Sequence, residues 1–353
     1  MIERIQIENF KSIKNISLDL KPINIFIGAN GAGKSNFISF LEMMNKITEK
    51  KLQSYIAENA GIDNLLYYGR KKSDYISGLL DFDNTNAYYF KLKPTQNNRA
   101  YFEKESDYYN YIADTNKNYQ SWSKQIWGEG NEESLVIESD TYRANHVNRR
   151  LKNFKVYHFH DTGKNSKMKM MCMVGDNVEL REDGGNLAAF LYLLKKKHPE
   201  SFNLIESVIK SIAPFFNSFD LKPDRENEQN IQLEWKEAGS DMYMNAHRLS
   251  DGTLRMIALV TLLLQPVTPS TIIIDEPELG LHPFAIKKIS ALIKQASSNG
   301  QIIIATHSTT LIDNFEPEDI ITVERKNGDT YFNRLNSNEL EIWLEDYFIK
   351  KTI

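Results

Sequence analysis

A glycine-rich segment between an apolar strand and a helix restricts the fold of this chain more than any other feature. The segment runs from Gly28 to Ser35 and fits the pattern G-x-x-x-x-G-K-S in full. It follows Ile23 to Ile27, an apolar predicted strand, and precedes a helix predicted over Ser35 to Lys46. Glycines let backbone N–H groups turn inward around phosphates, and the helix N-terminus adds positive potential.

The sequence therefore predicts a phosphate-binding loop for a nucleotide. Lys34 is expected to reach the β- and γ-phosphates, and the Ser35 hydroxyl to ligate Mg²⁺. The residues predicted to surround the phosphates are Asn30, Gly31, Ala32, Gly33, Lys34, Ser35 and Asn36.

Strand patterns alternate with helical patterns along the second half of the chain, which predicts an α/β fold with a mostly parallel core sheet. Short strand patterns predict an added antiparallel meander over about 76–104, and a polar insertion without periodicity follows it, over about 105–153. The predicted parts are a lobe 1–160 with the loop, meander and insertion, a helical lobe 161–265, and a segment 266–353 that closes with a hairpin and helix.

Two carboxylates follow the buried strand pattern at Ile272 to Ile274. Because ligands of open parallel sheets gather at the carboxyl ends of strands, Asp275 is the expected partner of the Mg²⁺ held by Ser35. Glu276 is the candidate that polarises the attacking water. The alternative is a pair that caps the next helix.

A histidine follows the next buried strand pattern, Ile302 to Ile304. His307 is predicted to hydrogen-bond the γ-phosphate, and the alternative is an ordinary residue of a capped loop. His282, in Leu279 to Pro283, either contacts a partner subunit or caps a helix.

A third motif, Leu249 to Thr253, directly precedes an apolar helix predicted over Leu254 to Leu264. Its serine hydroxyl, backbone N–H groups and helix N-terminus suit a γ-phosphate. The phosphate loop already fills its own helix end. Ser250 and Gly252 are therefore predicted to clamp ATP that is bound to a second copy of the chain.

The composition is that of an ordinary globular protein, with 41% hydrophobic and 25% charged residues and a net charge of -4. The charge gives no general attraction to nucleic acid. The single cysteine, Cys172, is expected to be a packed thiol in a reducing compartment. No apolar run reaches the roughly 18 residues that span a bilayer. These features predict a cytoplasmic protein without membrane contact.

Together these motifs resemble the head of an ABC-type ATPase, in the branch that contains RecF, the SMC proteins and the overcoming-lysogenization-defect (OLD) ATPases. The resemblance covers Ile7 to Asn15, the phosphate loop, Leu249 to Arg255, Thr271 to Pro283 and Ala305 to Ser308. It implies a homodimer with ATP and Mg²⁺ between the copies, and contacts from Lys11 and Ser12 to the nucleotide. Two segments have no assigned role, and they are predicted to be a strand end (His158 to Thr162) and a helix-capping turn (Leu180 to Asn186).

Three functions fit these features: an ATP-gated dimer in DNA maintenance or anti-phage defence, the ATPase subunit of a transporter, and an ATP-bound scaffold. More than 200 positions separate Lys34 from Ser250, which favours the first over a compact transporter ATPase. RecF itself is the runner-up within that class. Glu276 favours hydrolysis over a scaffold and does not indicate the rate.

No nuclease domain is predicted after Trp343, so the expected partner is a separately encoded effector, a nuclease or a toxin. Nucleic acid is a second expected partner, through Arg143, Arg149, Arg150, Lys152 and Lys155. The alternative for these cations is a solvated helix face.

Overall fold

The computed structural model describes residues 1–82, 86–109, 123–128, 130–139, 141–335 and 343. Its two largest sheets have six strands each, in the orders β2-β1-β4-β5-β6-β7 and β17-β16-β3-β15-β14-β8. The chain divides into two compact units. Unit 1 holds 1–155, 303–307 and 316–353, and unit 2 holds 156–302 and 308–315.

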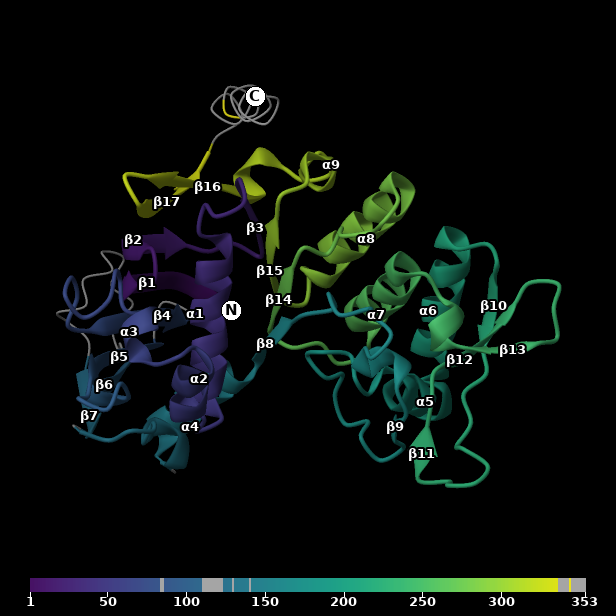
Figure 1. The fold of residues 1–353 in the computed structure, drawn as a ribbon, viewed down its shortest axis with the longest axis horizontal. Helices are drawn as coiled ribbons and strands as arrows, with labels where there is room; N and C mark the ends of the chain where they lie inside the picture. Colours follow the sequence, from purple (N-terminus) through teal and green to yellow (C-terminus); the bar gives the residue numbers. More distant parts are fainter. Residues whose placement is uncertain (83–85, 110–122, 129, 140, 336–342, 344–353) are drawn as a thin grey trace. The chain divides into compact units, whose positions relative to one another are not determined.

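The first sheet is antiparallel throughout and lies in unit 1 (Figure 1). Its strands are β1 (Ile2–Phe10), β2 (Ile13–Asp19), β4 (Ile76–Phe82), β5 (Asn86–Pro94), β6 (Ala100–Tyr109) and β7 (Ser123–Gly128). Every residue of β4 is buried, as expected for a strand paired on both edges and covered on both faces.

Helix α1 (Lys34–Thr48) joins the antiparallel sheet to the parallel one within unit 1. Phe40 packs on Phe10 of β1 and Phe90 of β5, with ring centroids 5.5 and 6.0 Å apart. Phe37, on another side of the helix, stacks on Phe26 of β3 (Ile23–Ile27) at 4.4 Å. Aromatic pairs of this kind contribute about 0.5–1.5 kcal/mol each beyond their burial. The helix that begins at the phosphate loop is therefore fixed on two sides.

The second sheet is mostly parallel. Strand β16 (Ile320–Lys326) runs parallel to β3, and β17 (Asp329–Arg334) returns antiparallel to β16 at the sheet edge. The remaining strands are β15 (Gln301–Thr306), β14 (Thr271–Asp275) and β8 (Phe154–Tyr157). All residues of β3 and β15 are buried, so the sheet is covered on both faces there.

The helices of unit 2 pack on one another, α5 on α6, α6 on α7 and α7 on α8 (Figure 1). They are α5 (Leu187–Lys197), α6 (Pro199–Ile212), α7 (Asp251–Leu264), α8 (Pro283–Ala296) and the short α9 (Thr309–Ile312). Short strands accompany them: β9 (Cys172–Met173), β10 (Phe216–Phe219), β11 (Asn230–Ile231), β12 (Glu234–Glu237) and β13 (Tyr243–Asn245). From Leu254 to Gln265 α7 and its C-cap are buried, so α7 is the central helix of this unit.

Unit 1 has three further helices, α2 (Leu52–Glu58), α3 (Ile62–Leu65) and α4 (Tyr142–Lys152). The polar insertion differs from its prediction. Strand β6 continues to Tyr109 and pairs with β7, so the meander extends into that region, while 110–122 lie outside the described residues. A polar sequence can form a strand through backbone pairing, so the lack of apolar alternation in this region did not exclude β7.

Helix α6 ends at Ile212, because the chain turns there into β10. By contacts, 266–302 group with the helices of unit 2, and the predicted lobes stay a prediction. The predicted C-terminal helix falls on residues outside the described ranges, apart from Trp343. Among the helices described, none combines the length and the apolar character needed to cross a bilayer.

Candidate functional site

The phosphate loop connects the buried strand β3 to α1 through conformations that require glycine. Gly31 has φ 77° and Gly33 φ 118°, in the left-handed region that favours glycine. At Gly28 an added Cβ would lie 2.2 Å from the carbonyl oxygen of Val323. Gly33 is also the N-cap of α1, and no side chain caps this helix end. The loop therefore presents backbone groups and the positive end of a 15-residue helix.

Lys34 and Ser35 differ in exposure at this helix end. The Lys34 ammonium is buried and donates hydrogen bonds to the carbonyl oxygens of Gly28 at 2.6 Å and Ala29 at 3.2 Å. A lysine that already lies over the loop needs little movement to meet phosphate oxygens. Ser35 is exposed in the first turn of the helix, where a hydroxyl ligand is accessible.

A second layer of hydroxyl groups supports the loop from within unit 1. Thr330 Oγ1 donates to the Ala32 carbonyl at 3.0 Å and lies 2.7 Å from Ser12 Oγ. Asn36 Nδ2 donates to the same Ser12 oxygen at 2.6 Å. Ser12 is buried and is thus a support of the loop, and its contact with the nucleotide stays a prediction. The sequence did not indicate Thr330, because 318 positions separate it from Ser12.

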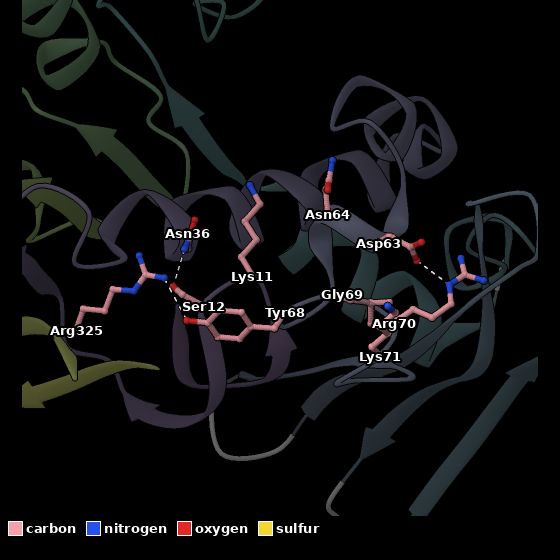
Figure 2. A pocket seen from close by; sticks show the side chains of 11 residues that line it. Lys11, Ser12, Asn36, Asp63, Asn64, Tyr68, Gly69, Arg70, Lys71 and Arg325 are labelled. Carbon is pink, nitrogen blue, oxygen red and sulfur yellow. Dashed lines mark hydrogen bonds and ion pairs between the residues drawn. The ribbon is translucent and has the colours of Figure 1, made fainter. Parts of the chain in front are cut away.

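A cavity of about 740 Å³ adjoins this network in unit 1 (Figure 2). Lys11 and Asn36 are on its wall, and Lys11 Nζ donates to Ser39 Oγ at 2.6 Å. Burial lowers the pKa of Lys11, opposed by the nearby Glu42 carboxylate. The other lining residues are Ser12, Asp63, Asn64, Leu66, Tyr68, Gly69, Arg70, Lys71 and Arg325. The structure thus brings Lys11, Ser12 and Asn36 together beside the phosphate loop.

Unit 2 carries the carboxylate pair at the carboxyl end of β14. Asp275 is the last residue of the strand and Glu276 follows it, both half-buried. Glu276 has φ 42°, a left-handed conformation that costs a residue other than glycine roughly 1–3 kcal/mol and is frequent at functional sites. The helix-capping alternative does not hold for this pair, since the N-cap of α8 is His282, whose Nδ1 accepts from the Phe284 amide at 3.3 Å.

Ser250 is exposed at the N-cap of α7 in unit 2. Its hydroxyl oxygen accepts a hydrogen bond from the Thr253 amide at 3.2 Å and lies 2.8 Å from the Thr253 hydroxyl. A Cβ added to Gly252 would lie 2.2 Å from the carbonyl oxygen of Gly280. The start of α7 and the loop after Glu276 therefore touch backbone to backbone. A helix N-terminus with an exposed hydroxyl is the geometry that the sequence predicted.

Asp251, next to Ser250 at the start of α7, has a partner for its carboxylate. Lys169, which is buried, approaches Asp251 Oδ1 at 3.4 Å and donates to the Thr162 carbonyl at 2.6 Å. The Asp251 carboxylate would repel a phosphate bound at Ser250, and the Lys169 ammonium at this distance offsets the repulsion.

His307 follows β15 and is half-buried. The residue that caps α9 is Ser308, whose hydroxyl accepts from the Leu311 amide at 3.3 Å, so His307 is not itself the cap. By the division of the chain, the phosphate loop and His307 belong to unit 1, and Asp275, Glu276 and Ser250 belong to unit 2. Their assembly into one nucleotide site stays a prediction.

The segments without an assigned role have structural partners in unit 2. His160 Nε2 donates to the Asp275 carbonyl at 2.8 Å, and Arg255 of α7 binds the carbonyls of Phe159 and His160. Asn186 is fully buried and bonds the loop before α5, accepting from the Arg181 amide at 2.9 Å. Sequence reasoning missed Arg255, although a single cation inside the apolar Leu254–Leu264 helix is a signal that could have marked it.

The basic helix α4 is amphipathic. Arg149 and Lys152 are exposed, whereas Val147 and Leu151 are buried. This arrangement fits a solvated face, and nucleic-acid binding there stays a prediction. Cys172 is half-buried, and burial raises the pKa of its thiol.

Comparison with known proteins gives the family context. A sequence profile for the family described as "AAA domain, putative AbiEii toxin, Type IV TA system" matches residues 23–313. The chain is 36% identical over 87 residues to the chromosome partition protein Smc of Methanocaldococcus jannaschii, which covers 24% of this chain and 7% of that protein. It is 30% identical over 145 residues to the energy-coupling factor transporter ATP-binding protein EcfA2 of Staphylococcus epidermidis, covering 38% and 50%. The chain thus spans half or less of these relatives.

Two solved structures share the fold over almost the whole chain. A Smc head bound to the C-winged helix domain of ScpA has a TM-score of 0.63 at 17% identity, covering 96% of this chain and 99% of that one. A Smc head from Pyrococcus furiosus, with an extended coiled coil and bound to the C-terminal domain of ScpA, has a TM-score of 0.60 at 16% identity, covering 98% of each chain. At these identities the likeness shows the fold, which is that of an ABC-type head with a mostly parallel core sheet and an added antiparallel sheet.

Proposed function

We propose that this chain, which belongs to the ABC-type ATPase family described as "AAA domain, putative AbiEii toxin, Type IV TA system", hydrolyses ATP between two copies of itself. The observation that carries the proposal is the phosphate loop. Its left-handed Gly31 and Gly33, the uncapped end of α1 and the ammonium of Lys34 form a cradle for a triphosphate. Asn30 and Ala32 complete the loop backbone.

We propose a magnesium ion beside the phosphates. The exposed Ser35 hydroxyl and the Asp275 carboxylate are oxygen ligands of the kind Mg²⁺ prefers, and Mg²⁺ in nucleotide sites takes few protein ligands besides phosphates and water. When bound, the ion neutralises charge on the phosphates. Of the chain's own residues, Ser35 and Asp275 would hold it.

Glu276 and His307 are the proposed catalytic side chains. A carboxylate that directly follows Asp275, held in a left-handed conformation, is a candidate to orient and deprotonate the attacking water. His307 would hydrogen-bond the γ-phosphate and so distinguish ATP from ADP. Lys34 would stabilise the charge that develops on the transferred phosphoryl group.

The second copy would supply Ser250 and Gly252. The positive end of α7, with its exposed serine hydroxyl, suits the γ-phosphate of an ATP bound to the other chain. Such an interface is isologous, with two equivalent nucleotides related by a two-fold axis. Lys11 and Ser12 would contact the nucleotide from the cavity next to the loop.

Three substitutions test this function. Lys34→Ala is expected to lose ATP binding, because it removes the ammonium that lies on the loop carbonyls. Glu276→Gln should retain ATP and accumulate as a dimer, since the water is no longer activated. Ser250→Arg should bind ATP and stay monomeric. Light scattering with and without ATP, combined with nucleotide-binding titrations, separates these outcomes. A Ser250→Arg monomer with wild-type ATPase activity would contradict the shared site.

We further propose that the ATP-bound dimer controls a separately encoded effector in anti-phage defence. The family description names a putative toxin of a type IV system, which supports a role of this chain in such a system. The test is a comparison of proteins from the native host that co-purify with Glu276→Gln and with Lys34→Ala in ATP. An effector that depends on nucleotide state should be enriched with one variant only. Equal recovery with both would contradict ATP control.

A further inference from the structure

A single arginine lies within the apolar helix α7, five residues after Ser250. Arg255 is 5% exposed, and burying a guanidinium is costly unless its donors are satisfied. Its partners are backbone carbonyls. Nε donates to Phe159 at 3.0 Å, Nη2 donates to His160 at 3.0 Å, and Nη1 donates to Leu279. All four residues lie in unit 2, so the arrangement is internal to one body.

The three carbonyls belong to two segments of unit 2. Phe159 and His160 follow β8, and Leu279 lies in the loop after Glu276. His160 closes the network, because its Nε2–H donates to the Asp275 carbonyl at 2.8 Å. One continuous set of hydrogen bonds therefore runs from α7 through Arg255 and His160 to the end of β14.

The backbone contact between Gly252 and Gly280 reinforces this arrangement. Because a Cβ on Gly252 would lie 2.2 Å from the Gly280 oxygen, the start of α7 cannot shift toward that loop without moving it. The pKa of Arg255 is lowered by burial, while Asp251 and Glu276 oppose this shift as neighbouring negative charges. The cation thus lies in the electrostatic range of both the clamp motif and the proposed general base.

We propose that Arg255 is a positioning residue that couples the Ser250 end of α7 to the Asp275–Glu276 end of β14, through His160 and the Leu279 carbonyl. The inference rests on the proposed function. A guanidinium suits this role because its planar fork holds several acceptors in one geometry, whereas an ammonium has no such fixed directions. When a phosphate binds at Ser250, any displacement of α7 would reach the loop that carries Glu276.

Arg255→Lys is the direct test, since it keeps the charge and removes the fork. We expect kcat for ATP hydrolysis to fall about tenfold to 100-fold, because small misplacements of catalytic groups have effects of this size. KM for ATP should stay within about twofold, because the phosphate loop is in the other unit. Arg225→Lys is the matched control, an exposed arginine of the same unit, and should behave as wild type.

Hydrogen exchange provides a readout that does not depend on ATP. In Arg255→Lys the amides of Leu279 and Leu281, which donate to Glu276 and Glu278 carbonyls, should exchange faster than in the Arg225→Lys control. If Arg255→Lys does not fold, His160→Leu removes the bond to Asp275, leaves the Arg255 guanidinium in place, and should give the same split between kcat and KM. The inference is overturned if the variant that folds keeps the wild-type kcat. If wild type itself hydrolyses no ATP, the proposed function fails, and unchanged exchange would then overturn the coupling separately.

Discussion

At the scale of single residues, Gly252 is constrained by a neighbouring backbone, and that constraint is independent of any nucleotide. Gly252→Ala would place a methyl group 2.2 Å from the Gly280 carbonyl oxygen, and a backbone atom cannot rotate away as a flexible side chain can. We expect the free energy of unfolding to fall by about 1–3 kcal/mol, the usual range for overpacking. Thermal and urea denaturation measure it.

Gly175→Ala is the matched control, because its Cβ would meet no heavy atom within 4 Å and its φ is ordinary. It should change stability by less than about 0.5 kcal/mol. If the two variants lost the same stability, α7 and the 279–282 loop would separate easily. That result would contradict the constraint that the Gly252–Gly280 contact places on this position.

The residues that could be identified from the sequence are those whose role depends on a short, continuous motif. Gly31, Gly33 and Lys34 share a short motif between a strand and a helix, and the structure gives them the conformations that the motif requires. Thr330 and Arg255 act across the fold. Each binds carbonyls far away in the chain, and no spacing rule connects Thr330 to Ala32.

At the scale of elements, the N-terminus of α7 combines a capping role with a proposed binding role, and two substitutions separate them. Ser250→Asp retains a good N-cap and adds a negative charge that the helix dipole favours, so stability should stay within about 0.5 kcal/mol. The same charge would repel a γ-phosphate. In a Glu276→Gln background, ATP should then no longer produce a dimer by light scattering.

Ser250→Ala is the reciprocal variant. It removes the acceptor for the Thr253 amide and should cost about 1 kcal/mol of stability, while it introduces no repulsion and leaves a weakened dimer. An Asp variant that dimerises as well as its parent would exclude phosphate at this helix end.

Elements with strong apolar periodicity were predictable, and those held by tertiary contacts were not. The buried strands β3, β14 and β15 and helix α7 follow directly from apolar runs and helix signals. Helix α2 has no cap of its own. The Glu133 carboxylate, about 80 positions away, accepts from the amides of Leu52 and Gln53 at 3.1 and 3.0 Å. A distant cap of this kind has no local signal.

At the scale of the whole molecule, the residues proposed for the nucleotide site divide between two units. Each unit is built from segments that are not consecutive in the sequence. Unit 1 takes the phosphate loop and His307, and unit 2 takes Asp275, Glu276 and Ser250. Sequence reasoning predicted the α/β head with its two kinds of sheet. It could not predict which segments group together, because β15 contributes residues to both units and only three-dimensional packing assigns them.

A mixing experiment decides whether two copies share each ATP. Lys34→Ala and Ser250→Arg are each expected to be inactive alone. In a heterodimer, the Ser250→Arg copy supplies an intact phosphate loop and the Lys34→Ala copy supplies an intact serine, so one complete site forms. Neither variant dimerises alone with ATP, and each heterodimer has one complete site of two, so ATPase activity should recover to at most about half of wild type.

The matched control mixes Lys34→Ala with the double variant Lys34→Ala/Ser250→Arg, in which no pairing yields a complete site. Its ATPase activity should stay at background at every mixing ratio, whereas the test mixture should peak at equal amounts of the two variants. A site built within one chain predicts that the test mixture also remains at background, since every individual copy carries a defect. The position of the activity maximum therefore distinguishes a shared site from a self-contained one without any knowledge of the effector.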